Sequence, residues 1–271
     1  MKICKIEQHY SSVIQEVIAY MTTPASAWAR DLGFLAESIS IDARWNRYSD
    51  AYRPHQRNCH EAILNATENL PQRQRIVLLG AGIIYDVPLA DLIERFAEVI
   101  LVDCIFSKTT RKLVREFPSV KLVEFDLSGV CEHLATHDGK KNLPELKSGF
   151  PDVALEADLV VSLNILSQLP LMPEKFARKR KWDGNIAKWG EQIECAHIIG
   201  LQELPGPSLL ITDFAHLTYP ERSHNSYVEE STLYSITSDP ETEWIWDYRP
   251  ESVESGKARC ALKVGVWMFR K

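Results

Sequence analysis

The chain has 271 residues, of which 45% are apolar and 25% are charged, and its 31 basic and 37 acidic side chains give a formal net charge of -6. This composition is typical of a soluble globular protein and excludes an intrinsically disordered chain. The acidic balance provides no general attraction for polyanions, because nucleic-acid binding depends on Lys and Arg side chains that neutralise phosphates. We therefore expect no nucleic-acid partner.

Several features bear on the compartment. No run of about eighteen apolar residues occurs, so we expect no transmembrane helix and no membrane partner. Glu7, Gln8 and His9 interrupt the N-terminal apolar residues, so no signal peptide is predicted. The six cysteines form no Cys-x-x-Cys pair, which favours reduced thiols and a cytoplasmic protein. We expect no metal site, since residues 131–138, the tightest cluster of Cys and His, are interpreted as a short helix and polar loop.

The first seventy residues are predicted to be helical. Apolar residues recur at helical spacing over residues 13–18 and again over residues 59–66, where Pro71 ends the pattern. Between these segments, Thr23 and Pro24 resemble an N-cap and a first-turn proline for a helix over residues 25–38. We predict an N-terminal helical cap over residues 1–70.

From residue 75 onward the pattern changes to strands and helices in alternation. Short apolar runs occur at residues 76–79, 99–102, 120–125, 159–163 and 209–212, with amphipathic segments at residues 87–96, 108–117 and 185–204. Residues 243–248 and 261–269 are strand-like with only a polar linker between them, which predicts an antiparallel hairpin. We therefore predict an α/β domain over residues 71–271, with a Rossmann-like, mostly parallel seven-stranded sheet and helices on both faces.

Candidate ligand residues follow the first two predicted strands. Gly80 and Gly82 allow a tight turn and a close approach of the backbone to a ligand. Asp103 follows the second strand, 21 residues beyond Gly82, where a carboxylate accepts hydrogen bonds from ribose hydroxyls. Together these residues predict an adenosine-type ligand. The alternative for Asp103 is a cap of the next turn, and the two roles are compatible.

Polar residues also follow the third and fourth strands. Asp126 and Leu127 offer a carboxylate and a backbone amide for an adenine edge, and Asn164 offers an amide for a small ligand group. At each of these positions a loop cap is the alternative. In open parallel sheets, the carboxyl ends of the strands surround the ligand crevice.

Residues 53–271 resemble the class I S-adenosylmethionine-dependent methyltransferases. The turn at residues 80–82 resembles the first motif of that family, Asp103 and Asp126 its ribose-side and adenine-side acids, and residues 158–169 its fourth motif. The resemblance implies a methyltransferase with S-adenosylmethionine as cofactor and a small-molecule or protein acceptor. The cofactor-binding residues that it implies are Gly80, Ala81, Gly82, Asp103, Cys104, Asp126, Leu127 and Asn164.

The chain departs from that family at two positions. Leu78 stands where the family usually has an acidic residue, and Ile84 replaces a third glycine. These departures motivate an alternative, a non-catalytic relative that keeps the fold as a binding module. A nicotinamide-dependent oxidoreductase is a further alternative, which Tyr85 disfavours because it occupies the third glycine of the dinucleotide fingerprint. Asp86 either supplies part of the polar character that is lost at Leu78, or it caps a helix that starts at Val87. We favour the cap.

The sequence gives weaker indications of the residues that would bind the methyl acceptor. Trp45, Tyr48, Arg53, His55 and Tyr219 are our candidates for substrate binding, the first four as a lid near the cofactor. The alternative is a surface helix end whose aromatic residues fill the core of the cap. Since methyl transfer depends mainly on alignment, a base is needed only when the acceptor carries a proton, and His216 is the weak candidate for it. His197 is interpreted as a helix-packing residue.

Overall fold

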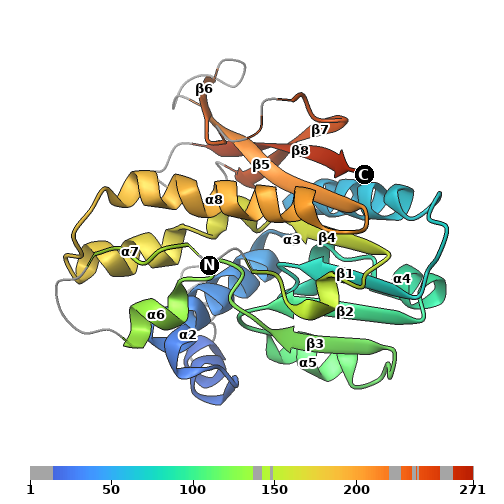
Figure 1. The fold of residues 1–271 in the computed structure, drawn as a ribbon, viewed down its shortest axis with the longest axis horizontal. Helices are drawn as coiled ribbons and strands as arrows, with labels where there is room; N and C mark the ends of the chain where they lie inside the picture. The colour runs from blue at the N-terminus through green and yellow to red at the C-terminus, as the bar shows by residue number, and fades with distance from the viewer. Residues whose placement is uncertain are drawn as a thin grey trace, which may run out of the picture.

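The computed structural model describes residues 15–136, 142–146, 149–219, 227–233, 236, 238–250 and 259–270. Its centre is an eight-stranded sheet in the order β3-β2-β1-β4-β5-β8-β7, with β6 paired to β5 (Figure 1). The strands are β1 Arg75–Leu79, β2 Glu98–Asp103, β3 Val120–Glu124, β4 Leu159–Leu163, β5 Ser208–Thr218, β6 Val228–Ser231, β7 Thr242–Arg249 and β8 Cys260–Phe269.

The sheet confirms the predicted fold class. Strands β1 to β5 pair in parallel, whereas β8 runs antiparallel to both β5 and β7. The chain order reverses between β1 and β4, which places the topological switch point at the carboxyl ends of these two strands. Strand β6 was not predicted, because its four residues are all exposed and carry no apolar alternation. It pairs with the end of β5, which extends to Thr218.

Helices surround the sheet. They are α2 Ala27–Asp31, α3 Phe34–Ala66, α4 Leu89–Arg95, α5 Lys108–Val114, α6 Cys131–Thr136, α7 Leu171–Lys179 and α8 Ile186–Glu203, with short 3-10 helices η1 Ile84–Asp86, η2 Asp152–Ala154 and η3 Leu166–Gln168. Residues 15–22 are also helical. Helices α2, α6 and α7 gather near the carboxyl ends of β1, β2 and β3 (Figure 1). Among the described residues, no helix combines the length and apolar character that a membrane span requires.

Alternate residues of β1 belong to two different cores. Val77 packs in one core together with Trp189 of α8. Leu78 packs in the other core with Ile63 of α3 and Leu92 of α4. Because helices cover both faces, the strand is apolar throughout and does not alternate with polar residues. Leu78 is fully buried, so a carboxylate at this position would lose its hydration in an apolar core.

The prediction of one helix over residues 25–38 is wrong. Helix α2 starts after Ser26, whose hydroxyl accepts a hydrogen bond from the amide of Ala29 at 3.3 Å. Gly33, with φ of 93°, then breaks the helix, because this left-handed conformation favours glycine. Helix α3 begins at Phe34 and continues to Ala66, with non-helical angles at Tyr48 and a proline inside. Residues 34–38, the predicted lid and the predicted helix over residues 59–66 therefore all lie in α3, which is kinked at Tyr48.

Helix α3 packs against the closing hairpin through aromatic side chains. The His55 ring stacks on Trp246 of β7 with centroids 3.9 Å apart, and Tyr52 contacts the same indole edge-on at 5.3 Å. The Tyr52 hydroxyl donates to the carbonyl oxygen of Tyr248 at 2.8 Å. The C-terminal half of α3 thus contributes to the same core as Leu78 of β1. The division of the chain at residue 70 stays a prediction.

A buried histidine gives the fold a testable pH dependence. His197 of α8 lies in the core, where its Nε2 atom is 2.9 Å from the hydroxyl of Ser162, and burial lowers its pKa from 6.5 to about 3. Between these values the unfolded chain binds a proton that the folded chain does not, so stability falls as the pH falls. We expect His197→Gln to reduce this slope by about 1.4 kcal/mol per pH unit, measured by urea unfolding between pH 6 and pH 4. Equal slopes for the two proteins would contradict this assignment.

Candidate functional site

A cavity of about 460 Å³ lies at the carboxyl ends of β1, β2, β3 and β4. Seven of the eight predicted cofactor residues line it, namely Gly80, Gly82, Asp103, Cys104, Asp126, Leu127 and Asn164. The eighth, Ala81, is fully buried behind them. The parallel register of the strands thus brings residues from four separate loops to one cavity, and its volume is in the usual range for small-molecule sites.

The turn after β1 is joined to the end of β2. The amides of Gly80 and Ala81 both donate to the carbonyl oxygen of Val102, at 2.9 and 3.2 Å. Gly80 has φ of 85°, and a Cβ atom there would lie 2.7 Å from the Cβ of Ile165. Glycine is required at this position for its conformation and for the close contact with the loop after β4.

Gly82 and Asp103 form the centre of this junction. The amide of Gly82 donates to Oδ2 of Asp103 at 2.9 Å, and the amide of Ile105 donates to Oδ1 at 3.2 Å. Burial raises the pKa of Asp103, while these two amide donors act in the opposite direction. Each carboxylate oxygen has a further lone pair for a ligand hydroxyl. The capping role and the ribose role that we considered for Asp103 are therefore compatible in this geometry.

The carboxylate of Asp126 has a structural role in the loop after β3. Its Oδ1 atom accepts hydrogen bonds from the amide and hydroxyl of Ser128 at 3.0 and 2.6 Å, and its Oδ2 atom accepts from the amide of Cys131 at 2.7 Å. The carboxylate therefore supports the start of α6, which is the loop-cap alternative for this residue. Asp126 still lines the cavity next to Phe125 and Leu127, which provide apolar walls.

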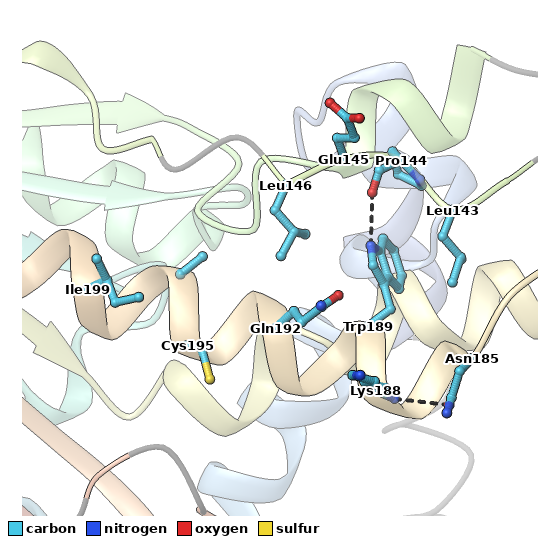
Figure 2. Close-up of a pocket in the computed structure, with 11 residues that line it drawn as sticks. Leu143, Pro144, Glu145, Leu146, Asn185, Lys188, Trp189, Gln192, Cys195 and Ile199 are labelled. Atoms are coloured by element: carbon cyan, nitrogen blue, oxygen red, sulfur yellow. Dashed lines mark hydrogen bonds between the residues drawn. The ribbon is translucent and has the colours of Figure 1, made fainter.

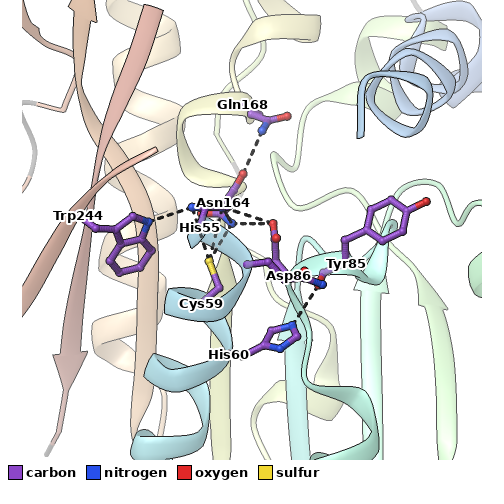
Figure 3. Close-up of polar contacts among 9 residues, drawn as sticks. His55, Cys59, His60, Tyr85, Asp86, Asn164, Gln168 and Trp244 are labelled. Carbon is purple, nitrogen blue, oxygen red and sulfur yellow. Dashed lines mark hydrogen bonds and ion pairs between the residues drawn. The ribbon is translucent and has the colours of Figure 1, made fainter. Parts of the chain in front are cut away.

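Asn164 connects the cavity to a buried polar cluster, which Figure 3 shows. Asn164 has φ of 50°, and its Nδ2 atom donates to Oδ2 of Asp86 at 3.1 Å. The same nitrogen lies 3.0 Å from Nε2 of His55 and 3.6 Å from Sγ of Cys59. On the far side of His55, the indole of Trp244 donates to Nδ1 at 3.0 Å. We refer to His55, Cys59, Asp86, Asn164 and Trp244 as the His55 cluster.

The prediction that Asp86 caps a helix starting at Val87 is wrong. Helix α4 starts at Leu89 with Pro88 before it, and Asp86 ends the 3-10 helix η1. The side chain of Asp86 lines the cavity and belongs to the His55 cluster. A Val-Pro pair after Asp86 prevents the early helix start, because the residue before proline avoids helical angles.

The five predicted substrate residues are absent from the described lining of the cavity. Trp45 stacks on Tyr85 with centroids 4.4 Å apart, and Tyr48 is buried. Arg53 is exposed and pairs with Asp50 at 3.4 Å. His55 is one layer behind the cavity wall. The aromatic members thus fill the contact between α3 and its neighbours, and their role toward a substrate stays a prediction.

His216 of β5 and Tyr219, which directly follows β5, also lie outside this lining. Tyr219 is buried in a small cluster with Leu217 and Ala261, and the guanidinium of Arg259 lies 4.5 Å from the centre of its ring. His216 is exposed over 47% of its side chain, and its Nε2 atom lies 3.8 Å from Asp213. The assignment of His216 as a base stays a prediction.

Several cavity residues were missed by sequence reasoning. They come from α3, α7 and β7 and comprise Phe34, Glu37, Ser38, Ile41, Met172, Lys175 and Trp246. These side chains reach the cavity only through tertiary packing, and no local motif marks them. Glu37 and Lys175 place one acid and one base at the cavity wall.

A second hollow, of about 700 Å³, lies along α8 (Figure 2). Its walls are formed by α8 side chains and by residues 143–146, and the indole of Trp189 donates to the carbonyl oxygen of Pro144 at 3.1 Å. It shares no lining residue with the first cavity. Since its described lining includes no strand end and no paired titratable groups, we place the candidate site in the first cavity.

No protein-family model matches the chain, and no curated protein matches it. Among solved structures, it is similar to the Burkholderia thailandensis 1,6-didemethyltoxoflavin-N1-methyltransferase, with 16% identity, a TM-score of 0.41, and 89% of this chain and 91% of that chain covered. A DhpI-SAM-HEP complex gives 10% identity and a TM-score of 0.39, with 89% and 99% covered. The 23S rRNA methyltransferase ErmE gives 12% identity and a TM-score of 0.28, with 56% and 44% covered.

The chain spans 44% of the length of ErmE and also 44% of a putative zinc-dependent alcohol dehydrogenase from Rhodobacter sphaeroides, to which it is similar with 12% identity and a TM-score of 0.31 over 54% of this chain. At these identities and TM-scores, the similarities concern the fold and carry no argument about activity. The assignment of function therefore depends on the residues of the cavity.

Proposed function

We propose that this chain binds S-adenosylmethionine in the cavity at the carboxyl ends of β1 to β4 and transfers its methyl group to an acceptor. The observation that carries the proposal is the set of residues after four successive strands that line one cavity: Gly80 and Gly82, then Asp103, then Asp126 and Leu127, then Asn164. Such a cavity at the switch point of a parallel sheet is where this fold type binds nucleotides.

The cavity residues fit an adenosine. Asp103 is held by two backbone amides and has lone pairs for the two ribose hydroxyls. Phe125, Leu127 and Ile105 offer apolar surface for a base. The close packing at Gly82, where a Cβ would lie 2.8 Å from the Asp103 carboxylate, brings the backbone next to the carboxylate that would bind the ribose.

S-adenosylmethionine supplies a methyl group on a sulfonium, which an acceptor takes by in-line displacement. The protein must then align the acceptor with this group and exclude water. The side chains that would contact the acceptor come from α3 and α7, with Glu37 and Lys175 as the charged members. We propose a small molecule or a protein side chain as the acceptor. The acceptor atom forms the new bond to the methyl carbon while the bond from this carbon to the sulfonium breaks, and S-adenosylhomocysteine leaves. An ionised acceptor needs no base, whereas an acceptor that carries a proton must release it, and His216 stays the candidate base for that case.

A non-catalytic binding module is the second candidate. The buried position of Leu78 and the use of the Asp126 carboxylate as a cap favour it, since both reduce the polar groups left for the ligand. Transfer of label from methyl-tritiated S-adenosylmethionine to a panel of amines, phenols, thiols and peptides tests the enzyme directly. Label in any acceptor, lost in Asp103→Ala, supports the methyltransferase. Cofactor binding without transfer to any acceptor supports the binding module.

A further inference from the structure

Gly82 lines the cavity, and its backbone is held on both sides of the Cα atom. Its amide donates to Oδ2 of Asp103 at 2.9 Å. Its carbonyl oxygen accepts two hydrogen bonds, from the hydroxyl of Thr110 at 2.9 Å and from the amide of Ser107 at 3.2 Å. All three partners lie within residues 103–110, between the end of β2 and the first turn of α5. One short segment therefore determines how the turn after β1 presents its backbone to the cavity.

A glycine needs contacts on both sides to keep one conformation. Without a Cβ atom, its φ and ψ angles have a wider range than those of any other residue. The hydrogen bond from the Gly82 amide holds the peptide group before its Cα atom, and the bonds to its carbonyl oxygen hold the peptide group after it. Both angles are fixed only when both peptide groups are held. The direction of the Gly82 amide therefore depends on the partners of the Gly82 carbonyl.

The proton of the Thr110 hydroxyl is directed at Gly82. A carbonyl oxygen only accepts hydrogen bonds, so Thr110 is the donor to Gly82. The hydroxyl oxygens of Thr110 and Ser107 lie 2.9 Å apart, and since Thr110 has used its one proton, Ser107 donates to Thr110. The hydroxyl oxygen of Ser107 accepts in turn from the amide of Thr110 at 3.0 Å. The bonds form a chain that ends on the carbonyl oxygen of Gly82, and in such a chain each bond strengthens the next.

Thr110 lies behind the cavity wall. It is 1% exposed and is absent from the described lining of the cavity. Replacing its hydroxyl with a methyl group would leave the carbonyl oxygen of Gly82 with the amide of Ser107 alone. Because the position is buried, solvent does not replace the lost donor. A role limited to the first turn of α5 is the alternative for Thr110, and it predicts an effect on stability without an effect on ligand binding.

We propose that Thr110 is a positioning residue for the ribose site, because its hydroxyl fixes Gly82 in the orientation that aims the Gly82 amide at the Asp103 carboxylate. This inference rests on the proposed function. Of the two amides that hold this carboxylate, the Ile105 amide belongs to the same segment as Asp103, whereas the Gly82 amide comes from the turn after β1. The carboxylate keeps its direction toward the ribose hydroxyls only while this turn is held. Thr110 thus contributes to ribose affinity without contacting the ligand.

Two ligands separate a role in ribose binding from a general effect on the fold. S-adenosylhomocysteine has both ribose hydroxyls, whereas its 2′,3′-dideoxy analogue lacks them and keeps the adenine and the amino-acid end. In calorimetry, we expect Thr110→Val to weaken S-adenosylhomocysteine by about threefold to tenfold, as loss of one hydrogen bond implies. The dideoxy analogue should stay within about twofold of its wild-type affinity, which also shows that the variant is folded.

Further variants test whether the hydroxyl acts through Asp103. Thr110→Ser keeps the hydroxyl and should bind both ligands as the wild type does, whereas Thr110→Ala removes it and should behave like Thr110→Val. In a protein that already carries Asp103→Ala, adding Thr110→Val should change the affinity for S-adenosylhomocysteine by no more than about twofold. The carboxylate through which Thr110 acts is then already absent.

Thr67→Val is the matched control. Thr67 is fully buried, and its hydroxyl donates to the carbonyl oxygen of Leu64 at 2.7 Å. This carbonyl oxygen also accepts from a backbone amide, as that of Gly82 does. Thr67 is absent from the described lining of the cavity. We expect Thr67→Val to lower stability in urea unfolding and to keep the wild-type affinity for both ligands.

The outcomes distinguish this inference from the proposed function. If the wild type binds neither ligand, the proposed function fails. If the wild type binds S-adenosylhomocysteine and Thr110→Val weakens both ligands equally or weakens neither, the assignment of Thr110 is wrong. A loss of affinity in Thr110→Ser equal to that in Thr110→Val would also contradict it, and so would additive effects of Thr110→Val and Asp103→Ala.

Discussion

Replacing Gly82 with alanine should abolish cofactor binding and destabilise the protein by about 2–3 kcal/mol. A Cβ atom at this position would lie 2.2 Å from the carbonyl oxygen of Ile105 and 2.8 Å from the carboxylate of Asp103. Both contacts are far too short, so the turn after β1 must move away from the end of β2. This movement breaks the hydrogen bond between the Gly82 amide and Asp103 and displaces the proposed ribose-binding carboxylate.

The measurements are urea unfolding for stability and calorimetry with S-adenosylhomocysteine for binding. Gly206→Ala is the matched control, because its Cβ would lie 2.8 Å from the carbonyl oxygen of Ala157. That contact lies before β4 and β5, at the amino edge of the sheet, so the control should lose stability and keep its affinity. Wild-type affinity in Gly82→Ala would show that the turn is not part of the site.

Removing the carboxylate of Asp103 is the second change with a large expected effect. We expect Asp103→Ala to weaken S-adenosylhomocysteine and 5′-methylthioadenosine alike, by about 100-fold or more, since two ribose hydroxyls lose a charged acceptor. The loss also leaves the amides of Gly82 and Ile105 without their partner, so stability should fall by about 1–3 kcal/mol. An equal effect on both ligands would show that Asp103 acts on the adenosine that the two ligands share.

Asp158→Ala provides the control for this loss. Oδ2 of Asp158 accepts hydrogen bonds from the amides of Gln74 and Arg75 at 2.6 and 2.8 Å, at the amino edge of the sheet. Asp158 and Asp103 thus both satisfy two backbone amides, and only Asp103 lines the cavity. Asp158→Ala should reduce stability and leave affinity within about twofold. Calorimetry that finds both variants equally impaired, or Asp103→Ala unimpaired, would contradict the ribose assignment.

Much of the sheet was predictable because its signal is local. Runs such as residues 99–102 and 159–163 are apolar on both faces, and only a strand covered on both sides requires that pattern. The residues directly after such strands were predictable as a site for the same reason, since parallel pairing alone brings the strand ends together. Seven of the eight predicted cofactor residues line one cavity as a consequence.

The remaining part of the site depends on contacts between distant segments. His55 and Trp244 are 189 residues apart and meet only because α3 packs under the closing hairpin. Asp86 resembled a helix cap in the sequence, and only its contact with Asn164 shows a different role. The continuation of α3 through Pro54 likewise follows from packing, which overrides the local helix-breaking signal of proline.

Calorimetric titration of the wild-type protein with S-adenosylhomocysteine, with NADH as the comparison ligand, tests the central claim most directly. We predict one S-adenosylhomocysteine per chain with a dissociation constant on the order of micromolar, and no binding of NADH. The absence of S-adenosylhomocysteine binding at millimolar ligand would contradict the account, and tight binding of NADH would replace it with the oxidoreductase alternative.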